Sequence, residues 1–166
     1  MKNLLQYREL HKLKPGYGTG MSFPTGIVKD YIVKWNVNSI LDYGCGQVDN
    51  SEKYGVDKFY RYDPVVEGID RLPNVASVDL VLCTDVLEHI PAGEILYTLH
   101  RMRSYSKKAL IKIALFPALV HLPNGENAHC SLFESEEWVS LLETVWQINV
   151  LKDDGKYLGI EAFDGC

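Results

Sequence analysis

The order of apolar and polar residues along the chain predicts an α/β fold in which strands alternate with amphipathic helices. Short apolar runs predict strands at residues 40–41, 59–62, 78–83 and 109–116. Apolar residues at helical spacing predict helices over 25–35, over 93–102 and from about Ser135 onward. Ser135 is the expected N-cap of the last of these helices. The near-continuous run 78–83 is typical of a central parallel strand that is covered on both faces. A helix is expected to start where this run breaks, at Thr84 and Asp85. We therefore expect a mostly parallel sheet with helices on both faces.

The two ends of the chain complete this pattern. Residues 1–14 carry spaced leucines among basic residues, which is compatible with a short helix or an ordered arm. A glycine-rich loop over 14–24 follows it. The last apolar runs, 146–151 and 157–163, flank the turn sequence DDG, which predicts an antiparallel hairpin. The C-terminal part of the sheet is therefore expected to be antiparallel.

Composition and charge restrict the classes of function. A chain of 166 residues, 46% hydrophobic and 23% charged, predicts one globular domain over 1–166. No apolar run approaches the roughly 20 residues that span a bilayer, and charges interrupt the N-terminal segment too often for a secretion signal. We therefore expect a cytoplasmic protein without a membrane partner. The formal net charge of −5 disfavours a nucleic-acid partner, and the basic residues from Arg101 to Lys112 are interpreted as a solvated helix end.

The sequence SILDYGCGQ, residues 39–47, is where a binding site is expected. A strand leads through Asp42 into a turn with Gly44 and Gly46, and glycine permits positive φ and close approach of a ligand to the backbone. Open α/β folds bind ligands at this carboxyl edge of the sheet. Asp63 follows the next strand, at the spacing that places a carboxylate beside a ribose. Together these features predict a nucleoside site, with an ordinary strand and turn as the alternative.

Two nucleoside-binding families compete for this motif. The dinucleotide fingerprint GxGxxG requires a third glycine where this chain has Asp49, and an acid there would repel a pyrophosphate. LDYGCGQ resembles instead the first motif of class I S-adenosylmethionine-dependent methyltransferases, commonly LDxGCGxG, whose cofactor is a cationic sulfonium without phosphate. The chain departs from that motif at Val48, where the family commonly has its third glycine.

Further segments extend the resemblance over most of the chain. VDLVLCTDVLEHIP, residues 78–91, resembles the fourth motif of the same family. The Tyr17-Gly18 loop, the YDP sequence ending at Pro64, and the LPNGENAH loop before Trp138 resemble small, compact bacterial and phage methyltransferases. The resemblance implies a trimmed Rossmann-like methyltransferase fold, in which residues 1–24 form an N-terminal arm followed by a loop that covers the cofactor. Too few residues precede residue 78 for the family's usual third strand and its helix.

The resemblance also implies the cofactor and its contacts. S-adenosylmethionine is the expected cofactor and S-adenosylhomocysteine the product, and methyl transfer from a sulfonium requires no metal. Asp70 is expected to replace the adenine contact that the trimming removes. The full set of expected cofactor-binding residues is Tyr17, Gly18, Asp42, Tyr43, Gly44, Cys45, Gly46, Asp63, Pro64, Asp70, Cys83, Thr84 and Asp85.

His89 and His129 are the candidate catalytic bases, because histidine titrates near neutrality and both are expected on the substrate edge. The alternative is that each histidine pins a loop by hydrogen bonds. The other histidines, His11, His100 and His121, are expected to be ordinary surface or packing residues. A zinc site from His121, His129 and Cys130 matches no familiar spacing, so no metal is predicted. The four cysteines are expected to be reduced thiols, with a disulfide between Cys45 and Cys83 as the alternative.

The methyl acceptor is only partly restricted. Enzymes that methylate exocyclic amines of DNA bases carry an NPPY-like or DPPY-like segment where this chain has CTDV, and no cysteine follows a proline as in 5-methylcytosine enzymes. A small molecule is the favoured acceptor, and a protein or RNA group remains open. A noncatalytic S-adenosylmethionine-binding or interaction protein is the alternative function, and an NAD-type oxidoreductase is a third. The sequence does not indicate an oligomeric state.

Overall fold

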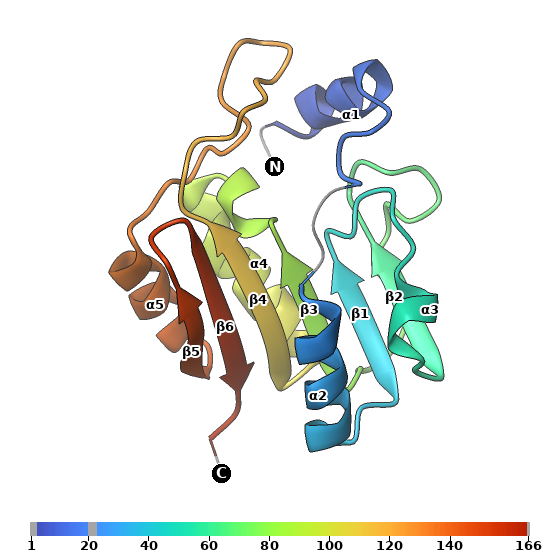
Figure 1. The fold of residues 1–166 in the computed structure, drawn as a ribbon. Helices are drawn as coiled ribbons and strands as arrows, with labels where there is room; N and C mark the ends of the chain where they lie inside the picture. The colour runs from blue at the N-terminus through green and yellow to red at the C-terminus, as the bar shows by residue number, and fades with distance from the viewer. Residues whose placement is uncertain (1–2, 20–22, 166) are drawn as a thin grey trace.

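A computed structural model of the chain describes residues 3–19 and 23–165 (Figure 1). Its centre is a six-stranded sheet in the order β2-β1-β3-β4-β6-β5. The first four strands in this order are parallel, whereas β6 is antiparallel to both β4 and β5. The strands are β1 (Ser39–Tyr43), β2 (Lys58–Tyr62), β3 (Leu80–Thr84), β4 (Lys108–Ala114), β5 (Gln147–Asp153) and β6 (Tyr157–Phe163). The expected mostly parallel sheet with an antiparallel C-terminal hairpin is confirmed.

Helices cover both faces of this sheet, as expected. They are α1 (Leu4–Leu13), α2 (Thr25–Trp35), α3 (Ser51–Tyr54), α4 (Ala92–Tyr105) and α5 (Ser135–Glu143), with a 3-10 turn, η1, at Leu87–His89. Successive strand residues point to opposite faces, so Leu82 packs with Val28 of α2 while Val81 packs with Leu99 of α4 and Trp138 of α5. The helix predicted over 25–35 forms with those bounds, and no helix of the described residues is long and apolar enough to cross a membrane.

The segment between β2 and β3 is short, as the sequence predicted. Within the described residues 63–79 the chain forms turns and bends and no strand or helix. The sheet therefore ends at β2 on this side. This places the turn after β1 and the turn after β2 next to each other at the carboxyl edge of the sheet.

Three local expectations were wrong. The chain does not enter a helix at Thr84: Asp85 has φ +55°, and α4 starts only after Pro91, because a residue before proline is disfavoured in helical conformation. The cap of α5 is Glu134 rather than Ser135, because Glu134 and Glu137 form a reciprocal capping box. Lys112 does not belong to a solvated helix end but lies within β4.

The alternative disulfide is also excluded. Cys45, Cys83 and Cys130 are free thiols, and Cys166 lies outside the described residues.

Candidate active site

A cavity of about 400 Å³ opens at the carboxyl ends of β1 and β3. Its floor is formed by the turns that follow β1, β2 and β3. Its roof comes from α1 and from the long loop after β4, which lie beyond the arrowheads of the parallel strands (Figure 1). Open parallel sheets bind ligands in this position. The predicted nucleoside site and the cavity therefore coincide in place.

The turn after β1 is tied to the end of β2 by its own N–H groups. The N–H of Gly44 and that of Cys45 donate to the carbonyl of Tyr62 at 2.7 and 3.2 Å, respectively. The N–H of Gly46 donates to Oδ2 of Asp63 at 3.0 Å. Dinucleotide-binding turns present such N–H groups to a pyrophosphate. Here the three groups are already satisfied by the protein, which disfavours a phosphate at this turn.

The two glycines of this turn are required by protein packing. Both have positive φ, +77° at Gly44 and +59° at Gly46. A Cβ on Gly44 would lie 2.4 Å from Cγ2 of Val86, and one on Gly46 would lie 2.2 Å from the carbonyl oxygen of Gly18. The positive φ expected at both glycines is confirmed, and loops of the chain itself fill the space that a Cβ would take.

Two acidic side chains flank the turn, as predicted, and both are buried. Asp63 accepts hydrogen bonds from the N–H groups of Gly46 and Val65, each at 3.0 Å. Burial raises the pKa of Asp42 to about 6, against the opposing effects of a hydrogen bond with Asn50 and the charge of Arg61. This end of the cavity is therefore acidic and has a pre-set geometry.

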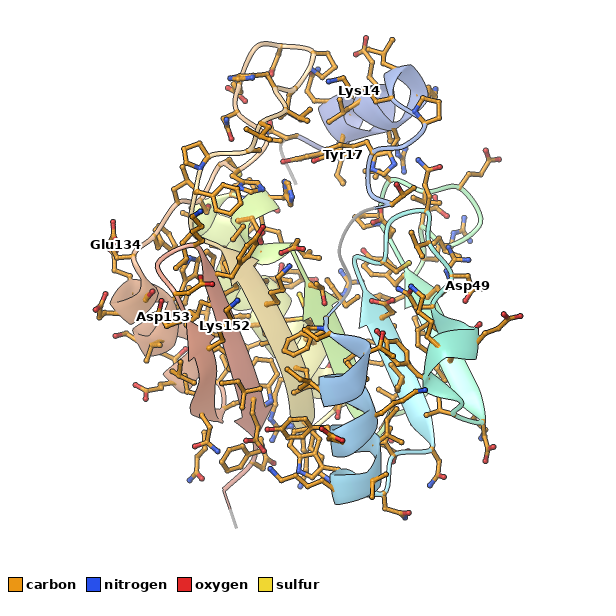
Figure 2. All side chains as sticks on the ribbon, in the orientation of Figure 1. Lys14, Tyr17, Asp49, Glu134, Lys152 and Asp153 are labelled. Carbon is orange, nitrogen blue, oxygen red and sulfur yellow. The ribbon has the colours of Figure 1, made fainter. Side chains whose placement is uncertain are left out.

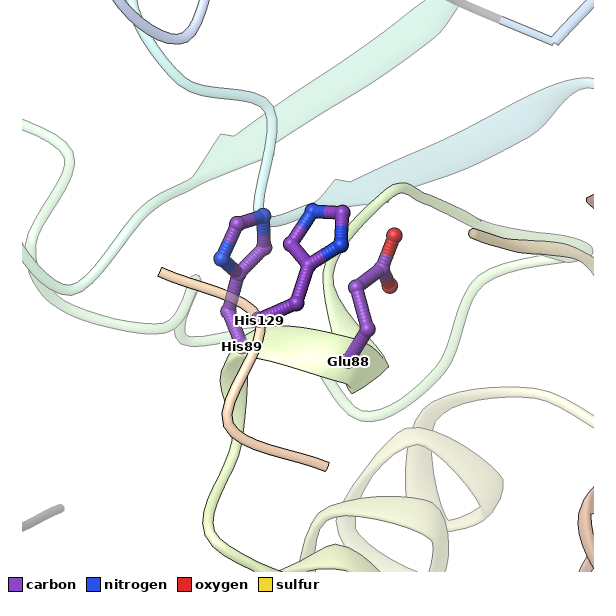
Figure 3. A group of neighbouring side chains, drawn as sticks. All are labelled: Glu88, His89 and His129. Carbon is purple, nitrogen blue, oxygen red and sulfur yellow. The ribbon is translucent and has the colours of Figure 1, made fainter. Parts of the chain in front are cut away.

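Glu88, His89 and His129 converge at the other end of the cavity (Figure 3). One potential ligand atom from each lies within 4.8 Å of the other two. Nδ1 of His89 is 2.8 Å from the carbonyl of Ala128, and Nδ1 of His129 is 2.6 Å from the carbonyl of Phe116. A carbonyl only accepts, so both histidines carry their proton on Nδ1 and leave Nε2 unprotonated when neutral. Burial lowers the pKa of His89 to about 4 and raises that of Glu88 to about 8.

Asp85 and Lys112 form an ion pair beside these residues. Nζ of Lys112 lies 2.8 Å from Oδ2 of Asp85, and the two side chains are 12% and 26% exposed. Oδ1 of Asp85 is buried and accepts no hydrogen bond from the described residues. Burial raises the pKa of Asp85, whereas Lys112 opposes this shift. The sequence signal for Lys112 was its position as a lone cation inside an apolar strand.

Most of the sequence-predicted site residues line the cavity. These are Tyr17, Gly18, Asp42, Tyr43, Gly44, Cys45, Gly46, Asp63, Pro64, Thr84, Asp85, His89 and His129. Two predicted residues do not. Cys83 is fully buried in the core on the α4 face, because its side chain points away from the cavity. Asp70 lies outside the cavity lining, with its carboxylate 3.8 Å from the guanidinium of Arg8.

Sequence reasoning missed the contribution of α1 to the cavity. Leu4, Tyr7 and His11 line it, and His11 had been assigned to an ordinary surface or packing role. The hydroxyl of Tyr7 donates to the carbonyl of Ala128, and Nδ1 of His11 is 3.0 Å from Nε2 of Gln47. Figure 2 shows Tyr17 below α1, on the side of the sheet. The spaced apolar residues of 1–14 predicted a helix but not the surface that it covers.

No protein-family model and no curated protein matches the chain. Solved structures do. One is 1,6-didemethyltoxoflavin-N1-methyltransferase of Burkholderia thailandensis, with bound 1,6-didemethyltoxoflavin and S-adenosylhomocysteine, at 13% identity and a TM-score of 0.67 over 99% of this chain and 89% of that one. A second is DhpI in complex with S-adenosylhomocysteine, at 15% identity and a TM-score of 0.64 over 98% and 95% of the two chains.

A third solved structure is the small RNA methyltransferase HEN1, at 9% identity and a TM-score of 0.64, matched over 86% of this chain and 25% of its own. Sequence identities this low show the fold alone. The sheet order, the antiparallel C-terminal hairpin and these structural matches together establish that the chain has the class I methyltransferase fold.

Proposed function

We propose that the protein transfers a methyl group from S-adenosylmethionine to a small-molecule acceptor. The observation that carries this proposal is the charge of the cavity. Its lining includes Asp42, Asp63 and Asp85, and no lysine or arginine of the described residues lines it. Because the N–H groups of the β1 turn are also occupied, the cavity favours a cationic ligand over a pyrophosphate.

The residues present fit the parts of S-adenosylmethionine. Tyr17, Tyr43 and Tyr54 supply aromatic and apolar lining suited to the adenosine portion. Each oxygen of Asp63 accepts one backbone hydrogen bond and retains a free acceptor site, so the carboxylate can still bind ribose hydroxyls. Asp42 can accept from the ammonium group at the amino-acid end. These assignments divide the cofactor between the turns after β1 and β2.

When bound, S-adenosylmethionine supplies an electrophilic methyl group on a sulfonium that leaves as a neutral thioether. The protein has to hold the two reactants in line and exclude water. The roof formed by α1 and by the loop after β4 serves to exclude water. His129 is the proposed proton acceptor, because Nε2 of its neutral ring is unprotonated.

Two observations favour a small acceptor. One matched structure has 1,6-didemethyltoxoflavin bound, and the formal charge of this chain is −5, which disfavours a nucleic-acid acceptor. The match to HEN1 keeps an RNA acceptor as the second candidate. A noncatalytic S-adenosylmethionine-binding protein would share the cofactor contacts and lack turnover.

Calorimetric titration with S-adenosylhomocysteine tests the cofactor part of the proposal. The wild type should bind, and Asp63→Ala should weaken binding at least about tenfold, because a hydrogen bond to a charged group contributes about 1.5–3 kcal/mol. Asp70→Ala is the matched control, since this acid lies outside the cavity lining, and it should bind like the wild type. Binding of NAD in place of S-adenosylhomocysteine would overturn the proposal. Release of S-adenosylhomocysteine in the presence of candidate acceptors distinguishes an enzyme from a noncatalytic binder.

A further inference from the structure

We propose that Glu88, His89 and His129 form a binding site for a divalent transition-metal ion at the acceptor end of the cavity. The three side chains come from two separate segments, η1 and the loop after β4, and converge on one point (Figure 3). Ligands about 2.0–2.2 Å from one zinc ion lie at most about 4.4 Å apart. One candidate ligand atom of each residue lies within 4.8 Å of the other two, so the three side chains have to move closer together when they bind an ion.

Both histidines are already oriented as metal ligands are. Metal-binding histidines almost always donate their second ring N–H to a carbonyl or a carboxylate, which fixes the tautomer and the ring plane. Here Nδ1 of His89 is held by the carbonyl of Ala128 and Nδ1 of His129 by that of Phe116. Nδ1 of His89 also lies 3.2 Å from the hydroxyl of Tyr7. No residue that the structure describes forms a hydrogen bond to Nε2 of either ring. The Nε2 atoms are therefore the nitrogens free to bind an ion.

Glu88 provides an independent indication of a ligand. Its side chain is fully buried, and its Oε1 accepts the N–H of Ala114 at 3.0 Å. Its Oε2 accepts no hydrogen bond from any described residue, although the carboxyl group is part of the converging cluster. A buried polar atom without a partner destabilises the folded protein, because the atom has lost its contact with water and no hydrogen bond replaces it. A metal ion bound to Oε2 would remove this cost.

The ligand set indicates the class of metal. Two imidazoles and one carboxylate suit Zn²⁺, Fe²⁺ and related first-row ions, whereas Mg²⁺ and Ca²⁺ prefer oxygen ligands. Three protein ligands leave at least one coordination position open, and His89 and His129 both line the cavity. Oδ1 of Asp85, also buried without a partner, is a further oxygen near this site.

Lys112 is the main opposing charge. Its ammonium group is close enough to lower the pKa of both Asp85 and Glu88. However, it is paired with Oδ2 of Asp85 at 2.8 Å, so its charge is largely compensated. The atoms that lack partners, Oε2 of Glu88 and Oδ1 of Asp85, are not the ones that Lys112 occupies.

The chemical role of the ion, unlike its binding, rests on the proposed methyl transfer. An acceptor oxygen bound at the open position would lose its proton more easily, because a divalent ion lowers the pKa of a bound hydroxyl or water. The histidines would then act as ligands rather than as bases, since both roles use the lone pair of Nε2. Metal binding and proton transfer by His129 are therefore exclusive alternatives.

Direct metal binding tests the site without any cofactor or acceptor. Protein without a polyhistidine tag is treated with a chelator and dialysed against Zn²⁺ alone, and separately against Co²⁺ alone. We expect one ion per chain and a visible Co²⁺ absorption band typical of nitrogen and oxygen ligands. Glu88→Gln and His129→Asn should each weaken binding by more than about 100-fold, because changes in residues that only orient ligands already cost about 10–100-fold.

Controls separate this site from other causes. His121→Asn removes an exposed histidine of the same loop and should leave binding unchanged, and circular dichroism checks that each variant folds. Asp63→Ala should retain the ion while it loses S-adenosylhomocysteine, so failure of the metal site and failure of the methyl-transfer proposal give different results. Absence of bound ion in the wild type would overturn the proposal. Metal affinity as high as that of the wild type in Glu88→Gln and in His129→Asn would also overturn it.

Discussion

The acidic side chains at the two ends of the cavity differ in how their oxygens are hydrogen-bonded. At the β1–β2 end, both oxygens of Asp63 accept backbone N–H groups, and the turn that carries Gly46 is locked by the same bonds. At the β3–β4 end, one oxygen of Asp85 and one of Glu88 accept nothing from the described residues. The first end therefore has its shape without a ligand, whereas the second contains polar atoms that a ligand would satisfy. A pre-set geometry at the β1–β2 end suits the cofactor, because the same cofactor binds in every reaction cycle. Oxygens without partners at the β3–β4 end suit an ion or an acceptor, because either could bind to them.

The largest expected effect is the loss of the locked turn. In Gly46→Ala the new Cβ would lie 2.2 Å from the carbonyl oxygen of Gly18, at a residue with φ +59°. We expect the free energy of unfolding to fall by about 3 kcal/mol, because backbone strain and a backbone clash act together. Urea denaturation measures this change.

Gly55→Ala is the matched control for that prediction. Gly55 also has positive φ, +65°, but nothing lies within 4 Å of its Cβ position. The free energy of unfolding of Gly55→Ala should fall by only about 1 kcal/mol. Equal losses at both positions would show that the contact with Gly18 does not matter.

The next effect concerns the acceptor end. Lys112→Met leaves Asp85 as a half-buried charge without its partner at 2.8 Å. We expect a loss of about 2 kcal/mol in the free energy of unfolding, with little change in affinity for S-adenosylhomocysteine. Adding Asp85→Asn to this variant should recover part of the loss, because the unpaired charge is then removed. A strong loss of S-adenosylhomocysteine affinity in Lys112→Met would contradict the division of the cavity into two ends.

A smaller effect follows from the raised pKa of Asp42, about 6 against an ordinary value of 3.8. Between these pH values the folded protein keeps a proton that the unfolded chain has released, so the free energy of unfolding decreases as pH rises through this window. Asp42→Asn cannot ionise and so avoids the cost of a buried carboxylate. Its free energy of unfolding should exceed that of the wild type by about 1–2 kcal/mol at pH 7. The difference should vanish near pH 4. Thermal denaturation at the two pH values measures it, and a variant that is less stable at pH 7 would contradict the sign.

The smallest effect is expected where α1 contacts the β1 turn. Gln47→Ala removes the hydrogen bond to His11, at 3.0 Å in an exposed position. An exposed hydrogen bond contributes about 0.5–1 kcal/mol, so the melting temperature should decrease only slightly. A loss as large as that of Gly46→Ala would mean that α1 holds the turn in place, and that the β1–β2 end is not complete by itself.

Residue patterns predicted the fold, and most of the residues that they assigned to the site line the cavity. Apolar periodicity gave the bounds of α2 and of β6, because each depends on neighbouring residues along the chain. The glycine turn and the acids Asp42 and Asp63 were recognisable because their spacing follows the strand and turn geometry. Local signals failed for Asp70, which pairs with Arg8 of a distant helix.

The sequence by itself determined which strands form, where the acids follow them, and that the sheet ends after β2 for want of residues. Only the tertiary structure decided that α1 covers the cavity, that Val86 and Gly18 fill the space beside the two glycines, and that Lys112 pairs with Asp85. It also decided that Glu88, His89 and His129 meet. The physical reason is that strand and turn preferences act between close neighbours, whereas these contacts join segments that are brought together only when the sheet has formed.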